Sequence, residues 1–466
     1  MGSRDPPLWT LSARELARAY AEGLSPLDVV QATLSRVREV NPGLNAIVTL
    51  DEVGALRAAE ASARRWKDGR PVSPLDGVPI TIKDNILVAG MRSTWGSRLY
   101  GDFVPEQDEA PVRRLRDAGA AILGKTNVPE FTVHGFTDNA LFGATGNPWD
   151  AALTPGGSSG GAVAAVASGM GAVALCTDGG GSIRRPAAHT GLVGFKPSRD
   201  MVPRGKGFPA ILHDFEVVGP VARCVDDVIY IMDVIGGEAW ARSKSRNCAR
   251  HPRIAYVAAF GDAPVDALVR GVVGDTVGRA KALGLDIETV SSLELAEPLS
   301  KVWPIISQTG VAWLLDQHEG WEGKVATAIE EMAAVGRQFT ARDYLGALDA
   351  VAELRRTFEC FFQRFDLLAT PTTAAMPWPK KEPHPTTIDG KAVGPRGHAV
   401  FTPLANAVGL PAISLPCRVE DGVLPVGLQV MSARERDWQL LKFARDHENL
   451  LFFHRWPSPS VESGRH

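Results

Sequence analysis

Two glycine-rich loops that carry serine, joined by a nearly unbroken stretch of small apolar residues, constrain the fold of this chain most. The loops are Gly156-Gly157-Ser158-Ser159-Gly160-Gly161 and Thr177-Asp178-Gly179-Gly180-Gly181-Ser182. The stretch between them, 160–176, is rich in Gly and Ala and is shorter than the roughly 20 residues that a membrane-spanning helix needs. It therefore predicts a buried helix that leads into a buried strand, an arrangement that can bring the two serines together.

Strand-like and helical patterns alternate along much of the chain. Strands are predicted at 78–82, 120–123, 172–176, 254–258, 367–369, 412–415 and 426–430. Helices are predicted at 110–118, 162–168, 265–283 and 341–362. This alternation is typical of an α/β fold with a largely buried sheet.

Capping signals predict that the N-terminal part, about 8–65, is helical. Ser12 and Glu15 form a capping box, and Ser25 precedes Pro26 at a first helical position. No break in composition divides the chain, so a single domain over 1–466 is expected, with a divergent helical region at about 296–362. The proline-rich stretch 371–395 is the predicted flexible loop.

Charge and cysteine content favour a cytoplasmic protein that binds neither nucleic acid nor membrane. The net charge is −3, which provides no strong field for a polyanion or an anionic lipid surface. The five cysteines are scattered and form no C-x-x-C pair, which favours a reducing compartment and disfavours structural zinc. The first residues lack the pattern of a secretory signal.

The second loop has the residues that a serine nucleophile requires. Gly179, Gly180 and Gly181 have no side chains, so their N–H groups can approach a substrate oxygen closely. The residues after Ser182 resemble the start of a helix, whose dipole would favour negative charge there. The alternative is a glycine-rich turn that only packs tightly or holds a phosphate, although no Walker lysine follows either loop.

The first loop matches the G-x-S-x-G pattern of the nucleophile elbow, but its context does not. That elbow requires a strand immediately before the serine. The residues at 147–155 are rich in turn formers instead, including Asn147-Pro148 and Thr154-Pro155. We therefore reject an elbow at Ser158 or Ser159.

The base is the remaining requirement, and Lys83 is the strongest candidate. Histidines follow no ordered Ser–Asp–His pattern, and His134 and His189, the nearest to the loops, are expected to be structural or pocket residues. Lys83 follows the apolar run 78–82 and would lie at the end of a buried strand. Burial lowers the pKa of a lysine and lets it accept a proton, although a lysine at a strand end is more often simply solvated.

Taken together, these segments resemble the amidase signature family, which are serine hydrolases with a Ser–Ser–Lys triad. The resemblance covers about 8–450 and implies a large mixed, mostly buried β-sheet flanked by helices. The segments that carry it are Gly77-Val78-Pro79-Ile80-Thr81-Ile82-Lys83-Asp84, Gly124-Lys125-Thr126-Asn127, the two serine loops, Gly194-Phe195-Lys196-Pro197, Val218-Gly219-Pro220, Thr370-Pro371-Thr372 and Gly409-Leu410-Pro411-Ala412.

The resemblance implies a role for each residue of the two loops. Ser182 would be the nucleophile, Ser158 the bridging serine after a cis peptide bond from Gly157, and Lys83 the base, with no metal or organic cofactor. The remaining implied roles are oxyanion binding by the N–H groups of Gly179, Gly180, Gly181 and Ser182, loop support by Ser159 and Asp178, and attachment of the loop to the core by Arg184. Arg185 stands at a variable position and could support the loop or contact substrate.

Departures from the family pattern concern the substrate. A larger residue is common where this chain has Gly179, so a looser oxyanion loop or a roomier pocket is expected, and His189-Thr190-Gly191 replaces a Phe-Cys-Gly type of sequence. The resemblance places the acyl pocket at 130–136, with Phe131, His134, Gly135 and Phe136 as candidate lining residues. Trp303, Trp313 and Trp321 would line the substrate entrance or pack in the core. An apolar lining favours aryl or alkyl amides, with carbamates or esters sharing the chemistry.

Two enzyme functions are compatible with the triad. The first is a stand-alone amidase, which the segment Thr126-Asn127-Val128-Pro129-Glu130-Phe131 resembles more closely; a homodimer is compatible with it. The alternative is the glutaminase subunit of a tRNA-dependent amidotransferase complex. A non-catalytic binding protein is disfavoured because Lys83, Ser158 and Ser182 are all present.

Overall fold

A single mixed sheet organises the fold. The computed structural model describes residues 6–246, 251–291, 296–452 and 455–457; Cys248, one of the five cysteines, lies outside them. In this described part the sheet has 11 strands in the order β1-β3-β2-β4-β6-β5-β12-β13-β9-β7-β8. Their bounds are β1 Ile47–Leu50, β2 Pro79–Lys83, β3 Ala121–Thr126, β4 Val173–Asp178, β5 Val193–Lys196, β6 Val217–Ala222, β7 Ile254–Tyr256, β8 Ile287–Thr289, β9 Leu367–Pro371, β12 Ala412–Pro416 and β13 Gly427–Ser432.

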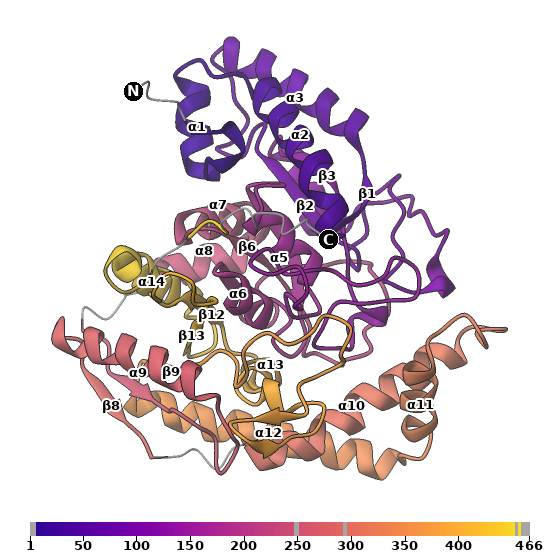
Figure 1. Ribbon diagram of the computed structural model, residues 1–466, viewed down its shortest axis with the longest axis vertical. Helices are drawn as coiled ribbons and strands as arrows, with labels where there is room; N and C mark the ends of the chain where they lie inside the picture. Colours follow the sequence, from indigo (N-terminus) through magenta and orange to yellow (C-terminus); the bar gives the residue numbers. More distant parts are fainter. Residues whose placement is uncertain (1–5, 247–250, 292–295, 453–454, 458–466) are drawn as a thin grey trace, which may run out of the picture.

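Helices surround this sheet, as Figure 1 shows. The N-terminal helices, at the top of the view, are α1 Ala13–Ala21, α2 Pro26–Leu44 and α3 Glu52–Lys67. The other helices are α4 Ala110–Asp117, α5 Gly160–Ala167, α6 Arg184–Thr190, α7 Val225–Ile235, α8 Gly237–Ser245, α9 Ala267–Ala282, α10 Ala296–Asp316, α11 Thr327–Gly336, α12 Ala341–Arg364, α13 Pro403–Val408 and α14 Asp437–Leu451. The prediction of an α/β fold with a large mixed, mostly buried sheet is confirmed.

The stretch between the two serine loops forms the predicted helix and strand. Every residue of α5 and of β4 is buried. Strand β4 pairs in parallel with β2 on one side and antiparallel with β6 on the other. Because β2 and β4 run in the same direction, their carboxyl ends meet at one edge of the sheet, and this brings Lys83 close to Thr177 and Asp178.

The N-terminal helices begin as the sequence predicts. Ser12 and Glu15 form a complete capping box, and the Ser25 side chain accepts a hydrogen bond from the Leu27 N–H. The region is not wholly helical, however, because the short strand β1 pairs antiparallel with β3.

Four strands of this sheet were not predicted: β1, β5, β6 and β8, of which β8 has only 3 residues. β1 and β5 have only 4 residues each, too few for a clear alternating pattern. β6 contains Gly219 and Pro220, which weaken a strand signal. Its ladder with β5 ends at Val221, beside Pro220, which has no N–H to donate.

The region 296–362 was predicted to be helical, and the stretch 371–395 was predicted to be a flexible loop. The first contains the helices α10, α11 and α12, as predicted. The second includes a two-stranded hairpin, β10 Thr387–Ile388 with β11 Lys391–Ala392. Single-domain organisation and flexibility of this loop stay predictions. None of the helices in the described residues is both long and apolar enough to cross a lipid bilayer.

Candidate active site

Lys83 ends strand β2 with its side chain completely buried. Its Nζ atom lies 2.9 Å from Ser158 Oγ and 3.0 Å from both the carbonyl oxygen and Oγ1 of Thr177. Burial lowers the pKa of Lys83 to about 8, because removal from water disfavours the charged form. A minor fraction of Lys83 is therefore already neutral near pH 7, and this neutral amine is able to accept a proton.

A polar network behind Lys83 opposes this lowering of its pKa. Among nearby charges, Glu216 raises the pKa of Lys83 most. The Asn85 side chain donates to Thr177 Oγ1 at 2.9 Å and to Glu216 Oε2 at 3.5 Å, which links Glu216 to the partners of Lys83. Arg204 forms an ion pair with Glu216 and fixes its position.

Ser158 and Ser182 are held close by contacts between their loops. The Gly157–Ser158 peptide bond is cis, as the resemblance implies. The Ser159 N–H donates to the Ser182 carbonyl oxygen at 3.2 Å, and Ser159 Oγ donates to the Thr177 carbonyl oxygen at 3.4 Å. No strand directly precedes Ser158, so the structure agrees with the rejection of a nucleophile elbow.

Asp178 shapes the second loop from within. Its carboxylate accepts hydrogen bonds from the N–H groups of Gly181 at 2.6 Å and Ile183 at 3.0 Å. The Gly181 N–H is therefore already bonded, which differs from the expectation that it holds an oxyanion. Within the described residues, the N–H groups of Gly180 and Ser182 have no protein acceptor recorded.

Arg184 ties this loop to the core. Its guanidinium pairs with Asp178 at 2.9 Å and donates to side-chain oxygens of Gln429 and Asn406, each at 2.6 Å. Burial alone would raise the pKa of Asp178, but Arg184 lowers it well below its usual range, so the carboxylate stays ionised. Arg184 is completely buried, and its recorded contacts are to the protein interior.

Arg185 spans both serine loops. Its Nη1 donates to the Gly180 carbonyl oxygen and to Thr402 Oγ1 at 2.9 Å, and its Nη2 donates to the Gly157 carbonyl oxygen at 3.3 Å. Burial lowers the pKa of Arg185 to about 10, so it carries its charge at neutral pH.

Leu212 fills the space beside Gly179. A Cβ atom at residue 179 would lie 2.5 Å from Leu212 Cδ1, far inside van der Waals contact. The departure at Gly179 is thus matched by a neighbouring leucine, and the pocket is not simply roomier there. A Cβ at Gly180 would overlap the indole ring of Trp303, so Trp303 packs directly on the oxyanion loop.

The other predicted pocket residues divide into two groups. Phe136 lies beside the first loop, since a Cβ atom at Gly157 would overlap the Phe136 carbonyl. Gly135 lies beside His398, since a Cβ atom at Gly135 would overlap the His398 ring. Phe131 packs against Trp95, and His134 against Phe136.

The remaining tryptophans and His189 can also be placed. Trp313 is 48% exposed, and Trp321 packs under Arg337. His189 is buried and its Nε2 lies 3.2 Å from the Ala375 carbonyl oxygen. The contact of Trp321 with Arg337 does not involve the serine loops. His189 Nδ1, in contrast, faces Gly156 of the first loop.

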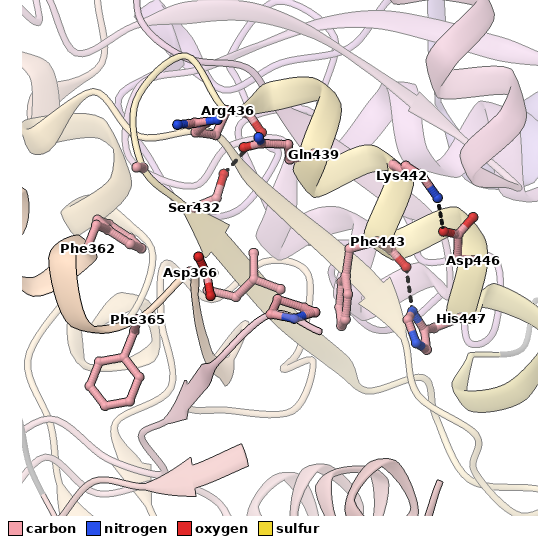
Figure 2. A pocket seen from close by; sticks show the side chains of 13 residues that line it. Phe362, Phe365, Asp366, Ser432, Arg436, Gln439, Lys442, Phe443, Asp446 and His447 are labelled. Atoms are coloured by element: carbon pink, nitrogen blue, oxygen red, sulfur yellow. Dashed lines mark hydrogen bonds and ion pairs between the residues drawn. The ribbon is translucent and has the colours of Figure 1, made fainter. Parts of the chain in front are cut away.

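A surface cavity of about 480 Å³ lies away from these loops, between the end of β13, the start of β9 and α14 (Figure 2). Aromatic and charged side chains line it together, among them Phe362, Phe443 and the ion pair of Lys442 with Asp446. None of the predicted catalytic residues belongs to its lining.

Comparisons with known proteins identify the family of this chain. The model of the family described as Amidase matches residues 28–441. A glutamyl-tRNA(Gln) amidotransferase subunit from Symbiobacterium thermophilum is 34% identical, covering 98% of this chain and 100% of the relative. An acylamidase from Rhodococcus erythropolis is 33% identical over 94% of this chain and 95% of its own length.

Solved structures of amide-hydrolysing enzymes share the fold of this chain. A bacterial aryl acylamidase of the amidase signature family superposes with a TM-score of 0.86 at 28% identity, covering 96% of this chain and 97% of its own. A 6-aminohexanoate cyclic dimer hydrolase superposes with a TM-score of 0.87 at 27% identity, covering 97% and 99%. The chain therefore belongs to the amidase signature family and is an amide hydrolase of that family.

Proposed function

We propose that this enzyme hydrolyses carboxylic amides through an acyl-enzyme on Ser182, with Lys83 as the base and Ser158 as the proton relay. The observation that carries this proposal is the 2.9 Å contact between Lys83 Nζ and Ser158 Oγ. Burial of Lys83 supports it, because the lowered pKa of about 8 makes the neutral amine available as a base.

The proposed reaction begins with proton transfer from Ser182 through Ser158 to Lys83. Ser182 Oγ then attacks the amide carbonyl, and the N–H groups of Gly179, Gly180 and Ser182 stabilise the oxyanion. The Asp178 carboxylate accepts a hydrogen bond from the Gly181 N–H and so stabilises the conformation of the loop. The relay in reverse protonates the leaving amine, and water releases the acyl group by the same route.

We infer that aryl or alkyl amides are the substrates, with carbamates or esters as side reactions. Trp303, whose ring packs on Gly180 of the oxyanion loop, supplies apolar surface for such groups. The similarity to an acylamidase and an aryl acylamidase points the same way. The enzyme is proposed to act on a small molecule, either alone or as a homodimer. A cytoplasmic location is proposed as well, because the described cysteines are free, as is usual in a reducing compartment.

A glutaminase subunit of a tRNA-dependent amidotransferase is the second candidate. It is favoured by the 34% identity to a glutamyl-tRNA(Gln) amidotransferase subunit over almost the whole length of both chains. In that case the same triad would release ammonia from glutamine within a complex.

An assay of the purified chain separates the two candidates. Anilides, aliphatic amides, aryl carbamates and glutamine are offered without any partner protein. Turnover of anilides or aliphatic amides by the chain alone is expected. Turnover of glutamine only, and only with partner subunits added, would overturn the stand-alone amidase.

A further inference from the structure

Four nitrogen-bearing side chains gather on the side of the serine loops that faces residues 396–402. They are Arg185, His189, Arg396 and His398, and three of them are buried, with exposed fractions of 4% for Arg185, 2% for His189 and 3% for His398. Arg396 is half-buried and opens the group toward solvent.

Contacts with the loops place this group beside the proposed nucleophile. Arg185 donates to the Gly157 and Gly180 carbonyl oxygens, which belong to the two serine loops. His189 Nδ1 faces Gly156, and His398 Nε2 faces Gly135. Arg396 stacks 4.3 Å from the centre of the Trp303 ring, which itself covers Gly180.

Two tryptophans hold the group together. The Trp378 ring lies 5.8 Å from the His189 ring and 4.8 Å from the His398 ring. Trp303 stacks at 5.8 Å on Phe215 and supports Arg396 from below. The side chains are thus fixed by packing, although their hydrogen-bonding atoms are not satisfied.

The buried polar atoms of this group lack protein partners. In the described part of the chain, no hydrogen bond is recorded for Arg185 Nε, His189 Nδ1, Arg396 Nη2 or either ring nitrogen of His398. Buried polar atoms are normally paired, because leaving a buried donor without an acceptor is costly. So many unsatisfied atoms at one place indicate a ligand that accepts hydrogen bonds.

The charge of the group is also unbalanced. Neither Arg185 nor Arg396 forms an ion pair with an acidic residue that the structure describes. Asp178 is the carboxylate that most affects Arg185, and it is already paired with Arg184. Burial lowers the pKa of Arg396 to about 9, and the charge of Arg185 contributes to the lowering, so an anion would relieve both costs.

We propose that Arg396, His398 and Arg185 bind a carboxylate on the acyl part of the substrate, so that the preferred substrates are half-amides of dicarboxylic acids. This inference rests on the proposed amidase function and names its substrate class. A carboxylate accepts several hydrogen bonds in one plane and matches the fork of an arginine. The position of the bound carboxylate follows from the contacts of the group. Arg185 contacts Gly157 and Gly180 of the serine loops, and His398 lies against Gly135.

The group also discriminates between anionic and zwitterionic amides. It offers hydrogen-bond donors and positive charge but no carboxylate that could balance an ammonium ion. Glutaramate, the half-amide of glutaric acid, should therefore be a better substrate than glutamine, which differs from it by one ammonium group.

A purely structural role, in which these side chains only support the serine loops, explains part of the contacts. Arg185 does connect the Gly157 and Gly180 carbonyl oxygens, and this accounts for its Nη atoms. It does not account for Arg396 and His398, whose side-chain nitrogens have no recorded hydrogen bond to the protein in the described residues. For this reason Arg396, rather than Arg185, is the residue to test.

The test compares two anilides that differ only in charge. The glutaric acid mono-4-nitroanilide carries a carboxylate, whereas the valeric acid 4-nitroanilide has the same five-carbon chain and is neutral. We expect kcat/KM to be at least about tenfold higher for the anionic anilide, mainly through a lower KM. Arg396→Gln should remove most of this preference, and Arg396→Lys should keep part of it. Arg337→Gln is the matched control, because Arg337 also stacks on a tryptophan, Trp321, but away from the serine loops.

Equal kcat/KM for the two anilides, or an equal loss on both in Arg396→Gln, would overturn the inference and leave the amidase function intact. Calorimetric binding of the anionic anilide to the Ser182→Ala variant tests the site without turnover. Binding that is tighter than for the neutral anilide, and weakened by Arg396→Gln, supports the inference. If Arg396→Gln does not fold, competitive inhibition of the natural chain by glutarate, with none by glutaramide, supports it; no inhibition by glutarate refutes it.

Discussion

Lys83 and Glu216 are linked through two intermediates, Thr177 and Asn85, although no direct hydrogen bond between them is recorded. Asn85 donates to Thr177 Oγ1 at 2.9 Å and to Glu216 Oε2 at 3.5 Å, and Thr177 Oγ1 lies 3.0 Å from Lys83 Nζ. The negative charge of Glu216 raises the pKa of Lys83, against the larger lowering by burial. The availability of the base is thus adjusted by a residue far from it in sequence.

The first prediction concerns the pH dependence of kcat/KM. The reaction needs neutral Lys83, so activity should rise with pH along a limb centred near the pKa of about 8. Glu216→Gln removes a charge that raises this pKa, so the limb should move to lower pH. pH–rate profiles of both proteins measure the shift, with Glu288→Gln at an exposed ion pair as the control. A limb that stays in place or moves to higher pH contradicts the role of Glu216.

The second prediction concerns Lys83 itself. Lys83→Ala should lower kcat by about 10²–10⁴-fold, because it removes the general base while the two loops keep their other contacts. Single-turnover kinetics with an activated anilide separate acylation from binding. A near-normal rate in this variant would point to a histidine base instead, with His189 beside Gly156 as the residue to examine.

The third prediction couples Gly179 to Leu212. Gly179→Ala alone should lower kcat and the melting temperature, because the new Cβ meets Leu212 Cδ1 at 2.5 Å. Leu212→Ala alone should destabilise by about 2–5 kcal/mol through the cavity it leaves. The double variant should be less impaired than the two single effects combined. A purely additive result in thermal melting and kcat would show that the two positions do not share this space.

The fourth prediction concerns the pair of Asp178 and Arg184. Asp178→Asn leaves Arg184 completely buried without its counterion, so we expect a loss of about 3–5 kcal/mol in unfolding free energy. Asp389→Asn breaks an exposed pair with Arg270 and should cost about 0–1 kcal/mol. Urea unfolding of both variants provides the comparison. Similar small losses would mean that Asp178 is not the electrostatic anchor of the loop.

Much of the site could be predicted because its residues lie in local patterns. The run 78–82 predicts a buried strand, and the glycines around Ser158 and Ser182 predict tight loops, so both were found from short stretches. Asn85 directly follows Lys83-Asp84 and could have been suspected on that ground.

The remaining partners could not be predicted because they are distant in sequence and carry no local signal. Leu212 and Trp303 meet the oxyanion loop only after the sheet and α10 are assembled. Arg396 and His398 lie just beyond the stretch 371–395, which the sequence identified only as a loop. Their proposed role depends on buried side-chain nitrogens that lack hydrogen-bond partners, and only a folded structure reveals these.

Covalent labelling with a serine-directed fluorophosphonate, read by intact mass and peptide mapping, tests the assignment of Ser182 as the nucleophile without any choice of substrate. We predict one label on Ser182 in the unmodified chain and none in Ser182→Ala, while Ser159→Ala keeps the label on Ser182. Labelling should also slow strongly in Lys83→Ala, because the nucleophile loses its base. A label that persists in Ser182→Ala, or that maps to Ser158, would contradict the assignment.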